Sequence, residues 1–259
     1  MILPAVLLGA LVGLLMGAVG GGGSILLVPI LVYLLGQPVR VATTTSLAVV
    51  GINALVGVAG HAREGHVLPR TGLVFGAAGV AGSVLGAWLG GLVSGRLFMT
   101  LFALVMVAGA AAIVLRTDSG DDDDGIGCED ACAPADWAKV VAAGLGVGVL
   151  TGLFGVGGGF VIVPALVLLL RLPMRDAVGT SLLVIALTAL SALVAKLGTT
   201  GLDAGLTAAF LGSGVAGVIA GERLSEHLPE RRLTQGFAAV VVLVACYVLW
   251  HTYLGGGPV

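Results

Sequence analysis

Charged side chains are scarce in this sequence. They make up 10% of its 259 residues, whereas 58% are hydrophobic and the mean hydropathy is +1.13. A soluble domain carries about 25% charged residues because its surface faces water. This chain has too few to cover a water-facing surface, so most of its exterior is expected to face lipid. The net charge of -2 also excludes a broad basic face that binds nucleic acid.

Motifs that carry enzyme chemistry are absent as well. The sequence has no Walker-type phosphate loop, no His-Glu-x-x-His motif and no paired carboxylates inside an apolar stretch. We therefore expect no catalytic residue, no cofactor and no bound metal. Met1-Ile2-Leu3-Pro4 lacks the positive region of a cleaved signal peptide, so the first apolar run is expected to remain as a membrane helix.

Cysteine is rare, with three residues in the chain. Cys246 lies in a long apolar stretch and is expected to be a small buried hydrophobe. Cys128 and Cys132 lie in the one strongly polar segment. They are either two unpaired loop thiols or a disulfide, and a disulfide would require that loop to face an oxidising compartment.

Unbroken apolar stretches divide the chain into helical segments. A helix needs about 20 apolar residues to span a bilayer, and most stretches approach this length. Residues 24–36 and 160–171 are too short to cross alone. The sequence therefore predicts an all-α polytopic membrane protein of about eight to ten transmembrane segments, with short helices that follow glycine-rich breaks. The stretches lie near residues 2–18, 24–36, 41–60, 71–93, 98–115, 137–154, 160–171, 177–197, 202–221 and 235–253.

The two halves of the sequence match in a single register, in which every matching pair has the same spacing along the chain. Chance matches between glycines are expected in a chain with 44 of them, but matches of Pro, Arg and a Thr-Ser-Leu run in the same register are not. Internally repeated membrane chains are most often secondary transporters, which bind their substrate where the repeats meet. The matches include Pro29 with Pro164, Pro38 with Pro173, Arg40 with Arg175, and Thr45-Ser46-Leu47 with Thr180-Ser181-Leu182.

This register predicts two homologous membrane repeats, residues 1–116 and 137–259, of four or five helical segments each. An acidic polar loop, residues 117–136, connects them. If the short segments do not cross, each repeat has four crossings, and Lys and Arg divide seven to five between the two sides. If they cross, each repeat has five, the repeats are inverted, and the division is nine to three. The positive-inside rule favours the second arrangement and segment length favours the first, so both remain open.

A glycine cluster opens each short segment, at residues 17–24 and 152–159. Consecutive glycines weaken a helix and permit backbone conformations that other residues avoid. A helix that restarts after such a break presents free N–H groups and the positive end of its dipole, which favour an anion. Glycine can also serve helix packing alone, and this interpretation suits Gly79, Gly82 and Gly86 better.

A hydroxyl-rich motif follows each cluster, at residues 40–47 and 175–182. These hydroxyls either cap the amides of their own helix or donate to an oxyanion. Arg40 and Arg175 are either interfacial anchors or a gate that attracts the anion, and Asp176 could partly neutralise Arg175. The candidate substrate-binding residues are Gly20, Gly21, Gly22, Gly23, Ser24, Thr45, Ser46, Gly155, Gly157, Gly158, Gly159, Thr180 and Ser181.

Other ionisable residues are scattered. His61 and Lys196 occupy equivalent positions at predicted helix ends, where a cation interacts favourably with the helix dipole. A proton relay through His61 or His66 is an alternative role for the histidines. Residues 222–232 carry mixed charges and are expected to form a surface loop.

The glycine and hydroxyl motifs together resemble those of the sulfite exporter TauE/SafE family. The resemblance rests on the Gly-x-x-Gly-x-Gly-Gly-Gly-x-x-x-x-Pro pattern from Gly152 to Pro164, followed by residues 175–182. The first half carries a looser copy, in which Thr44 replaces the usual Gly. The resemblance extends over residues 5–253.

Membership of this family would imply a secondary-active transporter of small sulfur-containing anions such as sulfite, thiosulfate or organosulfonates. Transport would be driven by H+ or another coupling ion rather than by ATP, and the protein would be a multi-pass protein of the plasma membrane. Two alternatives stay open. One is a membrane scaffold or assembly factor that transports nothing, and the other is a passive anion channel.

Overall fold

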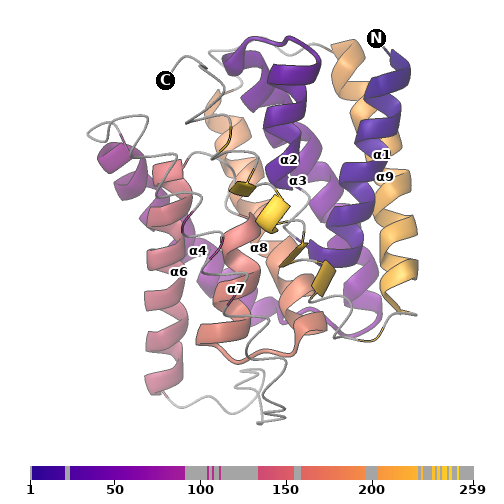
Figure 1. Cartoon of the computed structure of the whole chain (residues 1–259). Coiled ribbons are helices and arrows are strands. Elements are labelled where there is room, and N and C mark those ends of the chain that lie inside the picture. The colour runs from indigo at the N-terminus through magenta and orange to yellow at the C-terminus, as the bar shows by residue number, and fades with distance from the viewer. Residues whose placement is uncertain are drawn as a thin grey trace.

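The computed structural model describes residues 2–20, 24–90, 134–154, 159–196 and 204–226, with isolated positions between 104 and 111 and between 229 and 250. This part of the chain is helical and contains no strand, which confirms the all-α prediction for it (Figure 1). The helices are α1 (Ile2–Val19), α2 (Ser24–Pro29), the π-helical η2 (Ile30–Leu34), α3 (Val39–Arg63), α4 (Pro69–Gly90), α6 (Pro134–Phe154), α7 (Gly159–Leu169), α8 (Met174–Lys196) and α9 (Ala204–Glu226).

The bundle is apolar on its outside and partly polar inside. Leu7, Val84 and Val194 are each more than 60% exposed, while Asn53 and Ser181 are fully buried. Such a surface would be unfavourable in water but suits lipid. In the described part, three helices contain stretches long and apolar enough to span a membrane, and two shorter helices are also apolar. The long stretches are Thr44–Arg63, Met174–Val194 and Gly205–Ser225, and the shorter ones are Pro4–Ala18 and Trp137–Leu150.

Two sequence predictions are wrong in detail. Cys246 is exposed rather than buried, because an apolar side chain on a membrane helix can face lipid instead of protein. α6 begins at Pro134, inside the predicted connecting loop 117–136, since proline is well suited to the first turn of a helix. Cys128 and Cys132 lie outside the described residues.

Helices in the two halves begin at matching positions. Ser24 and Gly159, Val39 and Met174, and Pro69 and Ala204 are pairs of first residues, and each pair keeps the register that matches Pro38 with Pro173. Pro38 and Pro173 precede α3 and α8, as the sequence predicted. Their carbonyls accept hydrogen bonds from Ala42 N and Ala177 N, both at 2.9 Å, and so begin the helices in the same way.

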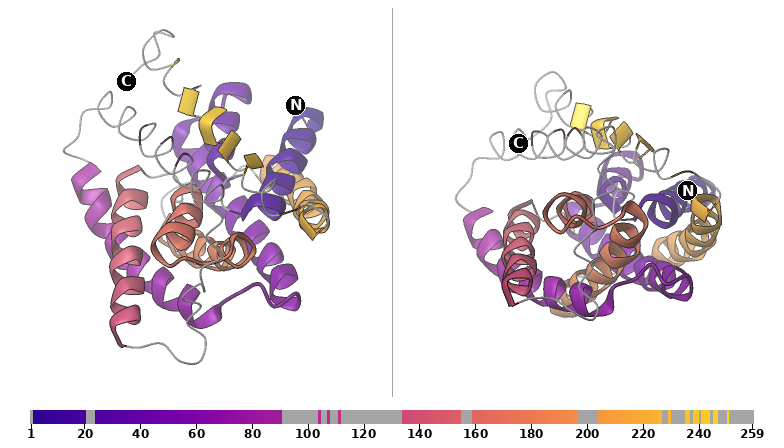
Figure 2. Two further views of the ribbon diagram at one scale, coloured as in Figure 1. Left: turned by 60° about the horizontal axis from the view of Figure 1, so that its bottom comes forward. Right: turned by 90° about the horizontal axis from the view of Figure 1, so that it is seen from below.

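The helices pair across the two halves of the chain. α1 packs along α9, and α6 packs along α4, on opposite sides of the molecule (Figures 1 and 2). Glycines permit both contacts, since a Cβ on Gly13 would overlap the Gly214 carbonyl and one on Gly148 would overlap the Gly79 carbonyl. The predicted packing role is therefore confirmed for Gly79, and also for Gly82, which lies against the Leu145 backbone. α3 and α8 lie against each other between the two pairs.

Contacts between glycines and their neighbours fix the directions of the helices. For the residues of α1, α3 and α9 that contact one another, a higher number on one helix meets a higher number on the next. These three helices therefore run parallel. Since α1 and α3 run the same way, the segment between them must carry the chain back across the bundle. α2 and η2 do this with 6 and 5 residues, roughly 16 Å of helix, and the flanking segments supply the rest. The contacts are those of Gly13 with Gly214, Gly17 with Val218, Asn53 with Gly214 and Gly57 with Val218.

α4, α6 and α8 form a second parallel set, which runs opposite to the first. α7 returns the chain between α6 and α8, as α2 and η2 do between α1 and α3. The described helices thus agree with the arrangement in which each short segment crosses back. The contacts are those of Gly72 with Leu183, Gly76 with Leu187, Gly144 with Phe75 and Gly148 with Gly79, while Gly51 with Leu190 and Gly57 with Leu182 show α3 and α8 to be antiparallel.

Candidate functional site

The described helices end before, and new ones begin after, both predicted breaks. α1 ends at Val19 and α2 begins at Ser24, and α6 ends at Phe154 and α7 begins at Gly159. Neither short segment therefore continues its preceding helix. Of the candidate glycines, Gly21, Gly22, Gly23, Gly155, Gly157 and Gly158 lie outside the described residues.

Gly20 lies where the first break meets α8. It is buried and has a φ of +75°, a conformation that favours glycine. A Cβ on Gly20 would lie 2.9 Å from the Ser181 hydroxyl oxygen and 3.3 Å from Val178 Cα. The structure therefore brings Gly20 and Ser181, two candidate residues from different halves, into direct contact.

The candidate hydroxyls are all buried. Ser24 at the start of α2, Thr45 and Ser46 on α3, and Thr180 and Ser181 on α8 are each at most 6% exposed. Buried hydroxyls are normally hydrogen-bonded, so their partners indicate what each one does.

Thr180 and Ser181 do not cap their own helix. Leu68 N donates to Thr180 Oγ1 over 3.1 Å, and Ser181 Oγ donates to the Val178 carbonyl over 2.7 Å. No side chain caps α3 at Pro38 either. The capping interpretation is therefore wrong for Thr180 and Ser181, because they lie in the second turn of α8, beyond the amides that lack partners. Thr180 instead ties α8 to the residue before α4.

Thr45 is the hydroxyl best placed for a ligand. It is 1% exposed, and its Oγ1 has no hydrogen-bond partner in the part of the chain that the structure describes. A buried polar group in this state costs about 1–3 kcal/mol. A polar ligand next to α3 would remove that cost.

The two threonines should respond differently to loss of the hydroxyl. Thr180→Val is expected to lower the free energy of unfolding by about 1–3 kcal/mol, because the buried Leu68 amide loses its acceptor. Thr45→Val is expected to leave stability unchanged or slightly raised, because it removes a polar group without a partner. Thermal unfolding of the two purified variants in detergent measures the difference, and equal losses would contradict these contacts.

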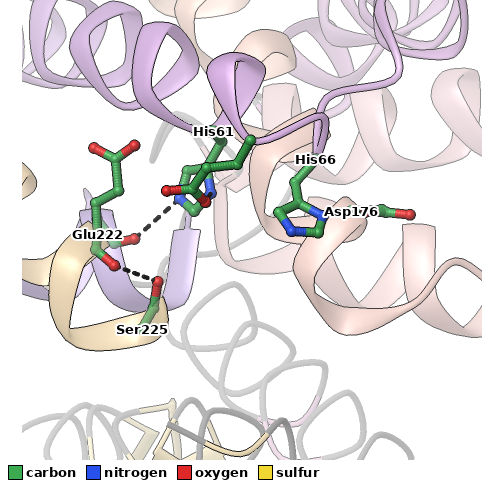
Figure 3. Close-up of polar contacts among 7 residues, drawn as sticks. His61, His66, Asp176, Glu222 and Ser225 are labelled. Atoms are coloured by element: carbon green, nitrogen blue, oxygen red, sulfur yellow. Dashed lines mark hydrogen bonds and ion pairs between the residues drawn. The ribbon is translucent and has the colours of Figure 1, made fainter. Parts of the chain in front are cut away.

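The arginines of the motif are only partly placed. Arg40 lies in the first turn of α3, and its side chain is outside what the structure describes. Arg175 is partly buried in the first turn of α8. Its neighbour Asp176 is paired with His66, whose Nδ1 lies 2.8 Å from Asp176 Oδ1 (Figure 3). This contact joins the α3–α4 connection to α8. No local pattern indicated it, because the two residues are 110 positions apart.

A second polar group lies near the same end of the bundle. His61 is 3% exposed, and its Nε2 lies 3.2 Å from the Gly17 carbonyl. Glu222 is 9% exposed, and a Cβ on Gly60 would overlap its carboxylate. The prediction of a surface loop from residue 222 is therefore wrong at its start. α9 continues to Glu226, and the missing side chain of Gly60 leaves room for the acid.

Comparison with known proteins agrees with the membrane architecture. A family model described as "Sulfite exporter TauE/SafE" matches residues 5–248. A "Probable membrane transporter protein" of Xylella fastidiosa (strain 9a5c) is 32% identical over 250 residues, which cover 95% of this chain and 94% of the relative. "Probable membrane transporter protein YdhB" of Bacillus subtilis (strain 168) is 31% identical over 175 residues, which cover 68% and 70%. No solved structure matches the chain significantly.

Proposed function

Because this chain belongs to the sulfite exporter TauE/SafE family of membrane transporters, we propose that it carries a small sulfur-containing anion across the cell membrane. Sulfite, thiosulfate and organosulfonates are the substrate class. Transport is secondary-active and uses the gradient of a coupling ion. The anion moves between two groups of candidate residues that lie toward opposite ends of the antiparallel helices α3 and α8. The first glycine break with Thr180 and Ser181 makes up one group, and the second break with Thr45 and Ser46 makes up the other.

The contact of Gly20 with Ser181 is the observation that carries this site. Gly20, at the first break, meets a buried hydroxyl from the other half, and α2 begins four residues later at Ser24. Amides at helix starts and hydroxyls can bind an oxyanion without a buried cation. Ser181 would donate to the anion by turning its hydroxyl from the Val178 carbonyl. Thr45, Ser46 and Thr180 complete the set that we assign to binding. Arg40 and Arg175 flank it and attract the anion.

The mechanism is alternating access between two homologous repeats, residues 1–116 and 137–259. The register shared by the two halves and the opposite directions of matching helices support an inverted repeat. Because α1 packs on α9 and α6 on α4, each moving body combines helices from both repeats. The end that carries Arg63, Arg171 and Arg223 faces the cytoplasm, by the positive-inside rule.

Binding can be tested with a panel of anions. Sulfite, thiosulfate and methanesulfonate are added to the purified protein, and the midpoint of thermal unfolding is measured. A ligand that binds only the folded protein stabilises it by about 2.7 kcal/mol at a hundred times its Kd, so a rise of several degrees is expected for at least one anion. Chloride at equal ionic strength is the control.

Flux into proteoliposomes completes this test. The anion that stabilises the protein should also be transported, and Thr45→Val should reduce its flux although the variant folds normally. If no anion stabilises the protein and none crosses, the protein is a membrane scaffold in which glycine serves packing. If flux occurs but never against a gradient, the protein is a passive channel.

A further inference from the structure

Two ionisable side chains are buried near one end of the bundle, close to the first glycine break. His61 comes from α3 and Glu222 from α9, and Figure 3 shows them together with Ser225. Ser225 Oγ donates to the Glu222 backbone carbonyl over 2.7 Å. This bond links Ser225 to Glu222 within the last turn of α9. Ionisable groups inside membrane helices are rare, and they commonly mark the path of an ion or proton.

The bond to Gly17 determines which nitrogen of His61 carries hydrogen. A carbonyl oxygen can only accept, so Nε2 must donate to it over the 3.2 Å between them. In the neutral ring, Nδ1 is then the nitrogen without hydrogen and the one that takes up a proton. Nδ1 lies 3.9 Å from Glu64 Oε2, so a proton arriving there meets a carboxylate.

Two carboxylates lie near His61. The Glu222 carboxylate lies against Gly60, the residue next to His61, and Glu64 follows on α3. Arg63 and Arg223 are exposed. α1 contributes no charged residue between Ile2 and Val19.

α8 and the α3–α4 connection also pack near His61. A Cβ on Gly179 would lie 3.1 Å from His61 Cβ, so α8 passes close to the ring. Its charged residues Arg175 and Asp176 lie in the first turn, where Asp176 is paired with His66. Arg70, in the first turn of α4, is exposed. Among the described residues, Glu222 is the buried acid that lies against Gly60, the residue next to His61.

His61 also holds the last turn of α1 before the break. Gly17 lies three residues before Gly20, which contacts Ser181 at the proposed anion site. A hydrogen bond from a charged donor is roughly twice as strong as one from a neutral donor. Protonation of His61 therefore fixes the end of α1 more firmly, and loss of the proton loosens it.

The other half of the chain does not repeat this arrangement. In the register that matches Arg40 with Arg175, Lys196 corresponds to His61 and Ala87 corresponds to Glu222. The anion-binding motifs occur in both halves, but the buried histidine with its acid occurs in one. A feature present once can give a coupled transporter a single proton per cycle.

Building on the proposed function, we propose that His61, with Glu64 and Glu222 as the carboxylates near it, is the proton-binding site that couples proton movement to anion movement. A proton from water on one side binds His61 Nδ1, and the same proton leaves to water on the other side. No other bond changes. Histidine suits this role because its charge changes between about pH 5 and pH 8.

The test uses the full chain in proteoliposomes, with the membrane potential held at zero and a pH difference of about one unit across the membrane. Radiolabelled methanesulfonate and thiosulfate are the probes, because their charges stay constant in this range. One proton per anion supports a concentration ratio of about tenfold per pH unit. The wild-type protein should reach about this ratio. His61→Gln, which keeps an N–H donor but cannot take up a proton, should give a ratio of one while downhill exchange continues.

His66→Gln is the matched control, because His66 lies at the same end but pairs with the partly exposed Asp176. It should accumulate the anion as the wild type does, and Glu222→Gln should behave like His61→Gln. Accumulation that persists in His61→Gln overturns the proton site. The proton site is also overturned if the wild-type protein exchanges anions but its concentration ratio does not respond to the pH difference. That second result does not contradict the transport proposal.

A measurement without substrate separates the two proposals. In protein labelled with 15N-histidine, the His61 signals are identified by their loss in His61→Gln. They should report hydrogen on Nε2 at high pH and on both nitrogens at low pH. If His61 takes up no second proton between about pH 8 and pH 5, the proton site is wrong, whether or not an anion is transported.

Discussion

Gly20→Ala is expected to reduce anion flux to the level of protein-free liposomes, while Gly36→Ala and Gly65→Ala keep most of it. All three glycines have φ between +66° and +79°, so each substitution carries a similar backbone cost of about 1–2 kcal/mol. They differ in their surroundings. A Cβ on Gly20 would press on Ser181 and Val178, whereas nothing lies within 4 Å of one on Gly36 or Gly65.

The difference between these variants isolates the contact between the first break and α8. Flux is measured in proteoliposomes at equal amounts of folded protein, as judged by size-exclusion chromatography and thermal unfolding. Ser181 cannot move far without breaking its bond to the Val178 carbonyl, so the new methyl group must displace the break itself. Equal flux in all three variants would mean that the break and α8 need not touch for transport.

Gly148→Ala is expected to destabilise the protein strongly, whereas Gly146→Ala, two residues away on the same helix, is neutral or slightly stabilising. A Cβ on Gly148 would overlap the carbonyl oxygen, the Cα and the carbonyl carbon of Gly79. These are backbone atoms, which cannot rotate aside as a side chain can. α4 and α6 must then move apart, and overpacking of this kind costs about 1–3 kcal/mol or more. Nothing lies within 4 Å of a Cβ on Gly146, where Ala gains up to about 1 kcal/mol of helix propensity.

The contact of α9 with α3 offers the same comparison. Gly214→Ala meets Asn53, and Gly212→Ala meets nothing within 4 Å. Thermal unfolding and the yield of monodisperse protein in detergent measure all four variants. If Gly146→Ala and Gly148→Ala lose the same stability, the close approach of α4 and α6 is not what holds this pair together.

Much of the fold follows from local features of the sequence. Apolar runs set the extent of the helices, and Pro38 and Pro173 set the starts of α3 and α8, because each proline lacks the N–H that would continue a preceding helix. The glycine clusters marked both interruptions for the same local reason. These features depend on neighbours in the chain and therefore appear in a single sequence.

The pairing and direction of the helices could not be predicted. Segment length and the distribution of positive charge favoured different numbers of crossings, because α2 and η2 are too short to span a bilayer of about 30 Å by themselves. The directions become clear only from contacts such as Gly13 with Gly214 and Gly57 with Leu182. Nothing local to α1 indicates that its partner is α9.

The candidate site shows the same division. The sequence singled out Thr180 and Ser181 because of their motif, but not the Leu68 amide that Thr180 accepts from, which is 112 residues away. Glu222 was assigned to a surface loop because it begins a run of charges. It is buried because Gly60, on another helix, leaves space for its carboxylate. Partners of this kind depend on tertiary packing.

The pairing of α1 with α9 has a consequence for synthesis of the protein. Gly13 and Gly214 are about 200 residues apart, so at about 5–20 residues per second the ribosome needs roughly 10–40 s to supply the second after the first. During that time α1 lacks its main neighbour, and its glycine-lined face meets lipid or an insertion chaperone. A nascent chain cut off before α9 should therefore be a substrate for membrane quality control, however complete its first half.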